Sequence, residues 1–454
     1  MRGHILSSDW FSDSRAPSSR VVLLGVVMLS LLAVMLTGCS GSSERSGKNT
    51  GKIELTYWAA PNPQEIDLAE VLVKKWNKLH PDIFVRMQPL PVNRSTEEVL
   101  MAAIAARTTP DVCSNIWPGS VPEYARDGAL VRLSSFPDFD SLASTRVGMN
   151  YMEQFRSADS NFYQIPWKAN PLMMIYNKAL FKKAGIGTPP LTYSEFLADA
   201  RKLTYSSRND GVIDHWMGYR DIRPVWWQRF FDFFALYKAA SYGKAFTKNG
   251  QVVADTQAVR EVFGFFAKCF KHDYFPRTVF SYDPFLEGVV ATEFVGPWTI
   301  SYIRSNYGGR LNFGIAPIPV PDGHVGPVDT YGDHKCMVIF STTKHPKASW
   351  EFMKFLLSEK ADLDLLEIAS QLPVRKDLLT TKEFAGFFND HPDLKLFAEE
   401  APYAHEVDQT PDQKEIFDAI SQEFEKCSVY NVVGPSKATR ELVRNVKVLL
   451  DWDE

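Results

Sequence analysis

The chain has 454 residues, a length that accommodates two or three domains. Its 45% apolar and 23% charged residues are ordinary values for a globular protein, which excludes a disordered or fibrous chain. Lys and Arg total 50 against 54 for Asp and Glu, so the net charge is -4 and no nucleic-acid partner is expected, because such binders need a cationic surface. Aromatic residues reach 13%, a first indication of surfaces that stack on a ligand.

Residues 1–38 are predicted to form a signal peptide. Val21 to Leu36 is an apolar run without a charge, shorter than the roughly 20 residues of a membrane-spanning helix. Small residues then lead to Cys39, which resembles the lipobox of bacterial lipoproteins, where this cysteine is lipidated after cleavage. The long stretch ahead of the run, with Asp9 and Asp13, departs from that pattern.

Residues 39–51 are expected to hold the lipidated Cys39 and a flexible tether, because the segment is polar and rich in Gly and Ser. We therefore expect an exported protein of the cell envelope. It would be lipid-anchored to the membrane, either in a periplasm or on the outer cell surface.

The remaining cysteines are Cys113, Cys269, Cys336 and Cys427. Their spacing matches no zinc-ligand pattern, so no metal site is expected. An exported location permits disulfides, but buried free thiols are the favoured interpretation.

Strands and helices alternate at the start of the body of the chain, which predicts a parallel α/β sheet with right-handed crossovers. In such sheets ligands bind at the carboxyl ends of the strands, where Trp58 ends the first strand and Trp117 follows the third. The expected strands are 53–58, 84–90 and 110–116, and the expected helices 65–80 and 95–106 lie between them.

A second unit begins near Pro166, again with mixed elements and without an internal repeat. Its expected strands are 172–176, 313–320 and 336–340, and its expected helices are 178–185, 192–203, 226–240, 259–269 and 346–357. The remainder of the chain is expected to be mainly helical. Trp76 and Trp350 lie on helical apolar stripes and are predicted core residues.

An ordered set of short phrases resembles the extracellular solute-binding proteins of bacterial ABC importers, in the carbohydrate-binding group that includes maltose-binding protein. Each phrase is weak alone, but their order is specific and spans nearly all of residues 53–452. They are Trp76-Asn77, His80-Pro81, Pro110-Asp111-Val112, Gly128 to Leu133, Ile165-Pro166-Trp167, Tyr176-Asn177-Lys178 with Phe181, Ala184 and Gly185, Pro189 to Thr192, Gly296-Pro297-Trp298 and Ala348 to Phe352.

The resemblance implies an α/β fold with two interleaved lobes and a ligand cleft between them, as in periplasmic binding proteins. The first lobe would take residues 52–168 plus 332–374, and the second 169–331 plus 375–454. Crossings near 168–171, 330–334 and 373–376 would form the hinge. The implied protein is a monomer without a cofactor that captures a sugar or oligosaccharide by lobe closure and delivers it to the permease subunits of an ABC transporter.

Sugars offer apolar faces to aromatic rings and hydroxyls to polar side chains, so both residue types are candidates for the cleft. Trp298 matches the family position where an aromatic ring stacks on a sugar, and Trp226 and Trp227 align with an aromatic pair of the second lobe. Trp167 and Lys168 lie at the first crossing. The complete set of predicted ligand-binding residues is Trp58, Asn62, Asn115, Trp117, Trp167, Lys168, Trp226, Trp227, Trp298, Asp333 and His334.

Two other functions stay open at this point. A binding protein for another solute, such as a phosphate ester, peptide or polyamine, would share the same architecture. A surface glycoside hydrolase is less favoured, since it needs two carboxylates about 5–10 Å apart and the sequence holds no catalytic signature. Asp329, Asp333, His334 and Cys336 could suggest a metal site, but a hinge or ligand-contact role is the favoured interpretation. We therefore expect no enzyme.

Overall fold

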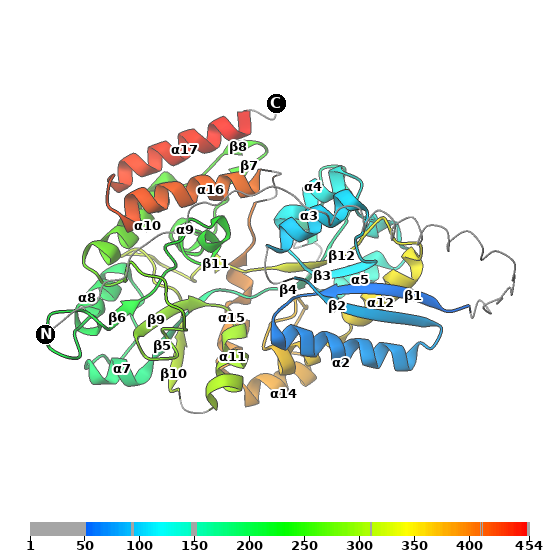
Figure 1. Ribbon diagram of the computed structural model, residues 1–454, viewed down its shortest axis with the longest axis horizontal. Coiled ribbons are helices and arrows are strands. Elements are labelled where there is room, and N and C mark those ends of the chain that lie inside the picture. Colours follow the sequence, from blue (N-terminus) through cyan, green and yellow to red (C-terminus); the bar gives the residue numbers. More distant parts are fainter. Residues whose placement is uncertain are drawn as a thin grey trace, which may run out of the picture. The chain divides into compact units, whose positions relative to one another are not determined.

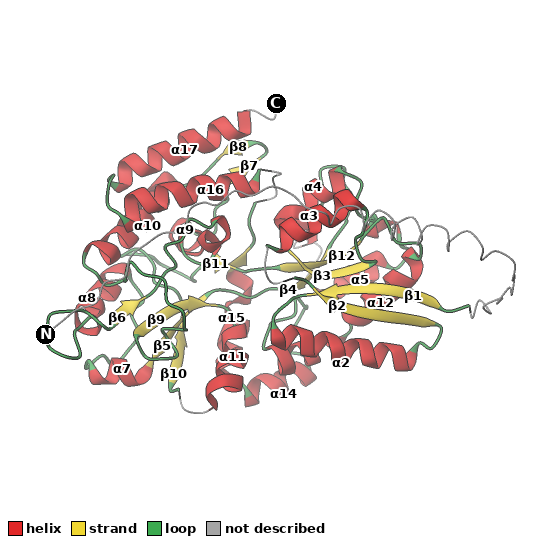
Figure 2. Cartoon of the chain, viewed as in Figure 1, coloured by secondary structure: helices red, strands yellow, loops and turns green. Residues whose placement is uncertain are grey.

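The computed structural model describes residues 51–91, 95–146, 152–308, 311–408, 410 and 412–451. The part of the chain from Lys52 onward forms one compact unit. It contains a five-stranded and a four-stranded sheet, each with its own flanking helices (Figure 2). We call the parts built around these two sheets the first and the second lobe. The predicted signal peptide, Cys39 and most of the tether lie outside the described residues.

The sheet of the first lobe has the strand order β2-β1-β3-β12-β4 (Figure 1). β1 shows the alternation of a half-buried strand, with Leu55, Tyr57 and Ala59 buried and Glu54 and Thr56 exposed. The strands are β1 (Ile53–Ala59), β2 (Ile83–Pro89), β3 (Val112–Ile116), β4 (Ile165–Lys168) and β12 (Lys335–Ile339). The helices are α2 (Pro63–Leu79), α3 (Thr96–Ala106), α4 (Val121–Arg126), α5 (Phe139–Arg146), α12 (Pro346–Leu356) and α13 (Glu359–Asp364).

Helix α2 begins where the sequence provides both a cap and a proline. The Asn62 side chain accepts a 3.0 Å hydrogen bond from the Glu65 backbone N–H, and Pro63 opens the first turn. The apolar stripe of the helix then packs on the sheet, and Trp76 is only 1% exposed. Trp350 on α12 is 2% exposed, so both predicted core tryptophans are confirmed.

The expectation of a parallel sheet is correct only for the first three strands. β1 pairs parallel with both β2 and β3, as βαβ crossovers require. β12 instead runs antiparallel to β3 and β4. The sheet is mixed because β12 returns from the second lobe, so no local crossover fixes its direction.

The sheet of the second lobe has the order β10-β5-β9-β6 and is largely antiparallel. Helices α10, α16 and α17 pack together on this lobe (Figure 1). The strands are β5 (Met173–Asn177), β6 (Trp216–Gly218), β9 (Val290–Val295) and β10 (Phe313–Ala316), with short pairs β7 (Thr247–Lys248) and β8 (Gln251–Val252), and β11 (Thr330–Tyr331) and β13 (Ala404–His405). The helices are α7 (Lys178–Lys183), α8 (Tyr193–Leu203), α9 (Phe233–Ser241), α10 (Thr256–Lys271), α11 (Trp298–Tyr307), α14 (Lys382–Asp390), α15 (Pro392–Glu400), α16 (Gln413–Phe424) and α17 (Pro435–Asp451).

Two predicted elements of this lobe are shorter than expected. The single helix expected over 226–240 is a 3₁₀ turn at Trp226–Phe230 followed by α9, because Asp232 leaves helical geometry and its side chain caps the Phe233 N–H. The strand expected over 313–320 ends at Ala316, since Pro317 cannot donate to a sheet.

Three chain segments lie side by side where the lobes join. The backbone N–H of Ala169 donates to the Leu372 carbonyl at 3.0 Å, and that of Leu172 donates to the Tyr331 carbonyl at 3.0 Å. These contacts bring residues 168–172, 330–332 and 372–374 together, and we call them the hinge segments.

The four cysteines of the folded part are buried free thiols, as favoured from the sequence. Among the residues that the structure describes, none of the helices combines the length and apolar character needed to cross a bilayer.

Candidate ligand-binding cavity

A cavity of about 960 Å³ is lined by residues of both lobes, a size typical of small-molecule sites. One side, the polar wall, comes from the first lobe and the hinge segments. It consists of Asn62, Gln64, Glu65, Ser95, Thr96, Glu97, Asn115, Lys168, Asp333, Lys335 and Gln371, with Pro63 and Trp117 beside them. The other side, the aromatic wall, comes from the second lobe and consists of Trp226, Trp227, Phe230, Phe231, Trp298 and Tyr302, together with Arg223.

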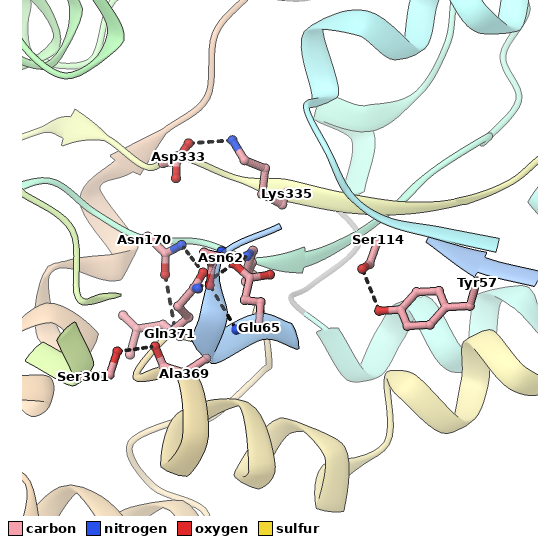
Figure 3. Close-up of polar contacts among 12 residues, drawn as sticks. Tyr57, Asn62, Glu65, Ser114, Asn170, Ser301, Asp333, Lys335, Ala369 and Gln371 are labelled. Atoms are coloured by element: carbon pink, nitrogen blue, oxygen red, sulfur yellow. Dashed lines mark hydrogen bonds and ion pairs between the residues drawn. The ribbon is translucent and has the colours of Figure 1, made fainter. Parts of the chain in front are cut away.

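Glu65 is the centre of the polar wall (Figure 3). Its Oε1 accepts hydrogen bonds from Lys168 Nζ at 2.6 Å, Gln371 Nε2 at 2.7 Å and Asn62 Nδ2 at 2.9 Å. Burial acts to raise the pKa of Glu65, but the positive charge of Lys168 and the three hydrogen bonds outweigh it and leave the pKa below its ordinary value. The carboxyl is therefore ionised and can only accept hydrogen bonds.

A second ion pair lies on the same wall, where Lys335 Nζ contacts Asp333 Oδ1 at 2.6 Å (Figure 3). Burial acts to lower the pKa of Lys335, but the Asp333 carboxylate raises it above its ordinary value. Asp333 and Asn115 both have left-handed backbones, with φ of 37° and 64°. Asp and Asn tolerate this conformation better than other side chains do, and such residues concentrate at functional sites.

Two cavity tryptophans are held against glycines. The ring of Trp298 lies over Gly296, where a Cβ would come within 2.0 Å of it. The ring of Trp117 lies over Gly119 in the same way, with a Cβ placed 2.5 Å from the indole. In each case only glycine permits this approach, so the sequences Gly-Pro-Trp and Trp-Pro-Gly fix where the indole lies.

The aromatic side chains also contact one another. Trp298 meets Phe231 edge-to-face at 6.1 Å between ring centroids. Trp117 of the first lobe packs on Trp226 and Phe230 of the second lobe, with centroids 5.6 and 5.2 Å apart. Trp227 is 38% exposed and Tyr302 41%, so both leave a face open to a ligand.

Two buried polar atoms in the cavity lining have no hydrogen-bond partner among the described residues. They are Glu65 Oε2 and Trp117 Nε1, and both side chains are only 4% exposed. Glu65 Oε2 can only accept a hydrogen bond, and Trp117 Nε1 can only donate one. Leaving such groups unpaired in a dry site is costly, which favours a ligand that supplies both partners.

Each of the three cations that the described residues contribute to the cavity lining is paired with a carboxylate. Lys168 pairs with Glu65 and Lys335 with Asp333, and Arg223 forms a close ion pair with Asp221.

The residues that could have suggested a metal site, Asp329, Asp333, His334 and Cys336, do not gather around one point, and several have separate partners. Asp329 contacts His405 Nε2 at 2.5 Å, and His334 Nδ1 lies 3.1 Å from Glu406. In the described part of the chain, no group of three or more His, Cys, Asp or Glu could hold a metal ion.

The structure brings most predicted ligand-binding residues to the cavity. Those in its lining are Asn62, Asn115, Trp117, Lys168, Trp226, Trp227, Trp298 and Asp333. Trp58, Trp167 and His334 are not among the lining residues. Trp58 packs on the small cluster around Leu100, and Trp167 and His334 are buried at 3% and 1% exposure.

Sequence reasoning missed several lining residues. Glu65 could have been found, because it stands three residues after the capping Asn62 and thus returns to the same loop. Glu97, Phe230, Tyr302 and Gln371 carry no local signal that distinguishes them from surface or core positions.

Comparison with known proteins matches residues 62–362 to the family described as bacterial extracellular solute-binding protein. The maltotriose-binding protein of Pyrococcus abyssi is 23% identical over 370 residues, which cover 80% of this chain and 74% of that protein. The sn-glycerol-3-phosphate-binding periplasmic protein of Rhizobium meliloti is 22% identical over 406 residues, with coverage of 82% and 88%.

Among solved structures, an uncharacterized protein from Listeria monocytogenes shares the fold with a TM-score of 0.74 and 29% identity, covering 88% of this chain and all of that one. The family consists of binding proteins, so the chain is a binding protein and not an enzyme. The matched residues include parts of both lobes and all of the cavity lining except Gln371. The chain therefore belongs to the bacterial extracellular solute-binding protein family.

Proposed function

We propose that the protein captures a neutral sugar or oligosaccharide in the cavity between its lobes. The observation that carries this proposal is the pairing of an aromatic wall with a polar wall across one cavity. A sugar ring has apolar C–H faces that stack on aromatic side chains, each worth about 0.5–1.5 kcal/mol beyond area burial. Its hydroxyls both donate and accept hydrogen bonds, which matches the unpaired acceptor of Glu65 and donor of Trp117.

The named relatives include binders of a sugar and of a phosphate ester, so the cavity must decide between them. A phosphate needs a cation or several N–H donors that are free to bind it. Here Lys168, Lys335 and Arg223 are already held by carboxylates. An anionic ligand would also meet the ionised Glu65, whose free oxygen cannot donate. These contacts favour a neutral ligand.

The proposed mechanism is closure of the two lobes about the hinge segments. A sugar that contacts both walls stabilises the closed arrangement by its differential affinity for that state. In this proposal the eight predicted residues in the lining contact the ligand. The two lobes move as rigid bodies, one formed by residues 52–168 plus 332–374 and the other by residues 169–331 plus 375–454. The closed monomer then docks on the permease subunits of an ABC importer. We further propose that Cys39 carries a lipid that anchors the exported protein to the membrane.

Ligand screening tests the proposed substrate class. Purified full chain should show a higher melting temperature with a neutral oligosaccharide of a panel that includes maltotriose, because a ligand of the native state stabilises it. Glycerol 3-phosphate, peptides and a polyamine serve as controls, and the sugar should be recovered unchanged. A rise with glycerol 3-phosphate alone would overturn the sugar assignment and leave the binding-protein family intact.

Lipidation has a separate test. Mass spectrometry of protein extracted from membranes should show a lipid on Cys39, and Cys39→Ala should release the protein into the soluble fraction. Equal membrane retention of both forms would contradict the anchor.

A further inference from the structure

A chain of three buried polar side chains runs from the cavity to the hinge segments (Figure 3). Glu65 Oε1 accepts from Gln371 Nε2 at 2.7 Å, and Gln371 Oε1 accepts from Asn170 Nδ2 at 3.0 Å. Glu65 and Gln371 line the cavity, whereas Asn170 is completely buried and is not a lining residue.

Asn170 binds the other two hinge segments. Its backbone N–H donates to the Gly332 carbonyl at 2.5 Å, and its side-chain oxygen accepts from the Leu372 N–H at 3.3 Å. Any rotation of the lobes must change backbone angles in these segments, so Asn170 lies where the backbone changes during closure.

The direction of every hydrogen bond in this chain is fixed. An ionised carboxylate only accepts, so Gln371 must turn its NH₂ toward Glu65. Its carbonyl oxygen then faces Asn170, which must offer its own NH₂ and present its oxygen to Leu372. Neither the Gln371 nor the Asn170 amide can flip alone without leaving a buried polar atom unpaired, so the Glu65 carboxylate sets the orientation of both amides.

We propose that Glu65, Gln371 and Asn170 form a relay that couples a ligand hydroxyl to the hinge. The inference rests on the proposed function. A sugar hydroxyl donates to the unpaired Glu65 Oε2, and this contact holds Glu65 against Gln371 and thereby holds Asn170 in the arrangement of the closed state. Glu65 also acts as a specificity determinant, because a ligand group without a hydrogen to donate cannot bind there.

A double-mutant cycle on ligand affinity tests the relay. Glu65→Gln and Asn170→Ala are measured singly and together by calorimetry, with maltotriose or the neutral oligosaccharide of the panel that binds most tightly. Residues without direct contact normally have additive effects, so their fold-changes in Kd multiply. The relay predicts that Asn170→Ala alone weakens binding several-fold and that Glu65→Gln alone weakens it at least about tenfold. The double variant should bind less than about twofold more weakly than Glu65→Gln alone.

Two further variants keep this test decisive. Glu65→Gln leaves Lys168 buried without its carboxylate, so Gln371→Met provides a second cut that leaves that ion pair intact. Because Gln371 contacts Asn170 directly, multiplicative effects of Gln371→Met and Asn170→Ala would contradict the relay. Glu97→Gln is the matched control, since Glu97 lines the cavity but contacts neither Gln371 nor Asn170 by any hydrogen bond seen in the described residues. Its effect should multiply with that of Asn170→Ala.

Each outcome is distinguishable. If no neutral oligosaccharide binds the wild-type protein, both the proposed function and the relay are wrong. If the sugar binds but the Glu65 and Gln371 cycles are multiplicative, only the relay is wrong. Non-additivity that extends to Glu97 would also overturn it, because the effect would then belong to the hinge mutation in general.

Discussion

The two walls of the cavity solve different physical problems. On the polar wall, Lys168 and Lys335 each pair with a carboxylate, and Glu65 accepts three hydrogen bonds on one oxygen. The aromatic wall has few polar contacts and depends on ring placement, as in the edge-to-face pair of Trp298 and Phe231. In the proposed binding mode, stacking on the aromatic wall would provide affinity for a sugar face, and the unpaired atoms of Glu65 and Trp117 would select which ligand atoms are accepted.

The largest loss of ligand affinity should come from removing the Trp298 ring from the aromatic wall. Trp298→Ala should weaken sugar binding at least tenfold, roughly 1.4 kcal/mol, because both stacking and apolar contact area are lost. Titration calorimetry with the sugar found by screening measures it. Thermal unfolding should show an intact fold, and truncation of the exposed Tyr430 provides a control away from the cavity. Unchanged affinity would remove Trp298 from the site.

A smaller change should displace the same ring without deleting it. Gly296→Ala places a methyl group where the Trp298 indole lies, so the ring must shift and affinity should fall by roughly three- to tenfold. Gly434→Ala is the matched control, because a Cβ there meets no atom within 4 Å. If Gly296→Ala binds the sugar like the wild type, the position of the Trp298 ring is not critical for binding.

The change with the smallest expected effect on ligand affinity concerns Glu293, a half-buried carboxyl of β9. Burial raises the pKa of Glu293 on β9 to about 8, with Asp283 adding to the shift and Arg220 opposing it only in part. Folding therefore retains a proton that the unfolded chain releases near the ordinary pKa of 4.5, so stability should decline as pH rises from about 4.5 to 8.

Glu293→Gln cannot ionise and should lack this decline. Its melting temperature relative to wild type should therefore rise between pH 5 and 8 and then level off. Glu70→Gln, at an exposed position of α2, should follow the wild-type curve. Parallel curves for Glu293→Gln and wild type would show that Glu293 is ionised throughout. Glu65 behaves oppositely, because its lowered pKa makes its contribution to stability disappear only as pH falls below the ordinary carboxyl range.

Much of the cavity could be predicted because its residues follow strand ends and turns with local signatures. Trp117 follows β3, Asn62 caps α2, and Trp298 stands in a Gly-Pro-Trp turn. The same logic failed for Trp167, which also lies beside a crossing. Its side chain turns into the core of the first lobe, while that of the next residue, Lys168, reaches Glu65. Adjacent strand residues point to opposite faces, and the sequence alone does not show which face meets the ligand.

The sequence by itself determined the local elements and the chemistry available to them. The capping box of Thr192 and Glu195 and the apolar stripe of α2 follow from short-range rules of helix capping and periodicity. Only the tertiary structure decided which distant residues meet. Glu65 and Gln371 lie 306 positions apart, and β12 enters a sheet whose other strands precede it by more than a hundred residues. Such pairings depend on the path of the chain between the lobes and on what each partner buries there, and no local pattern records either.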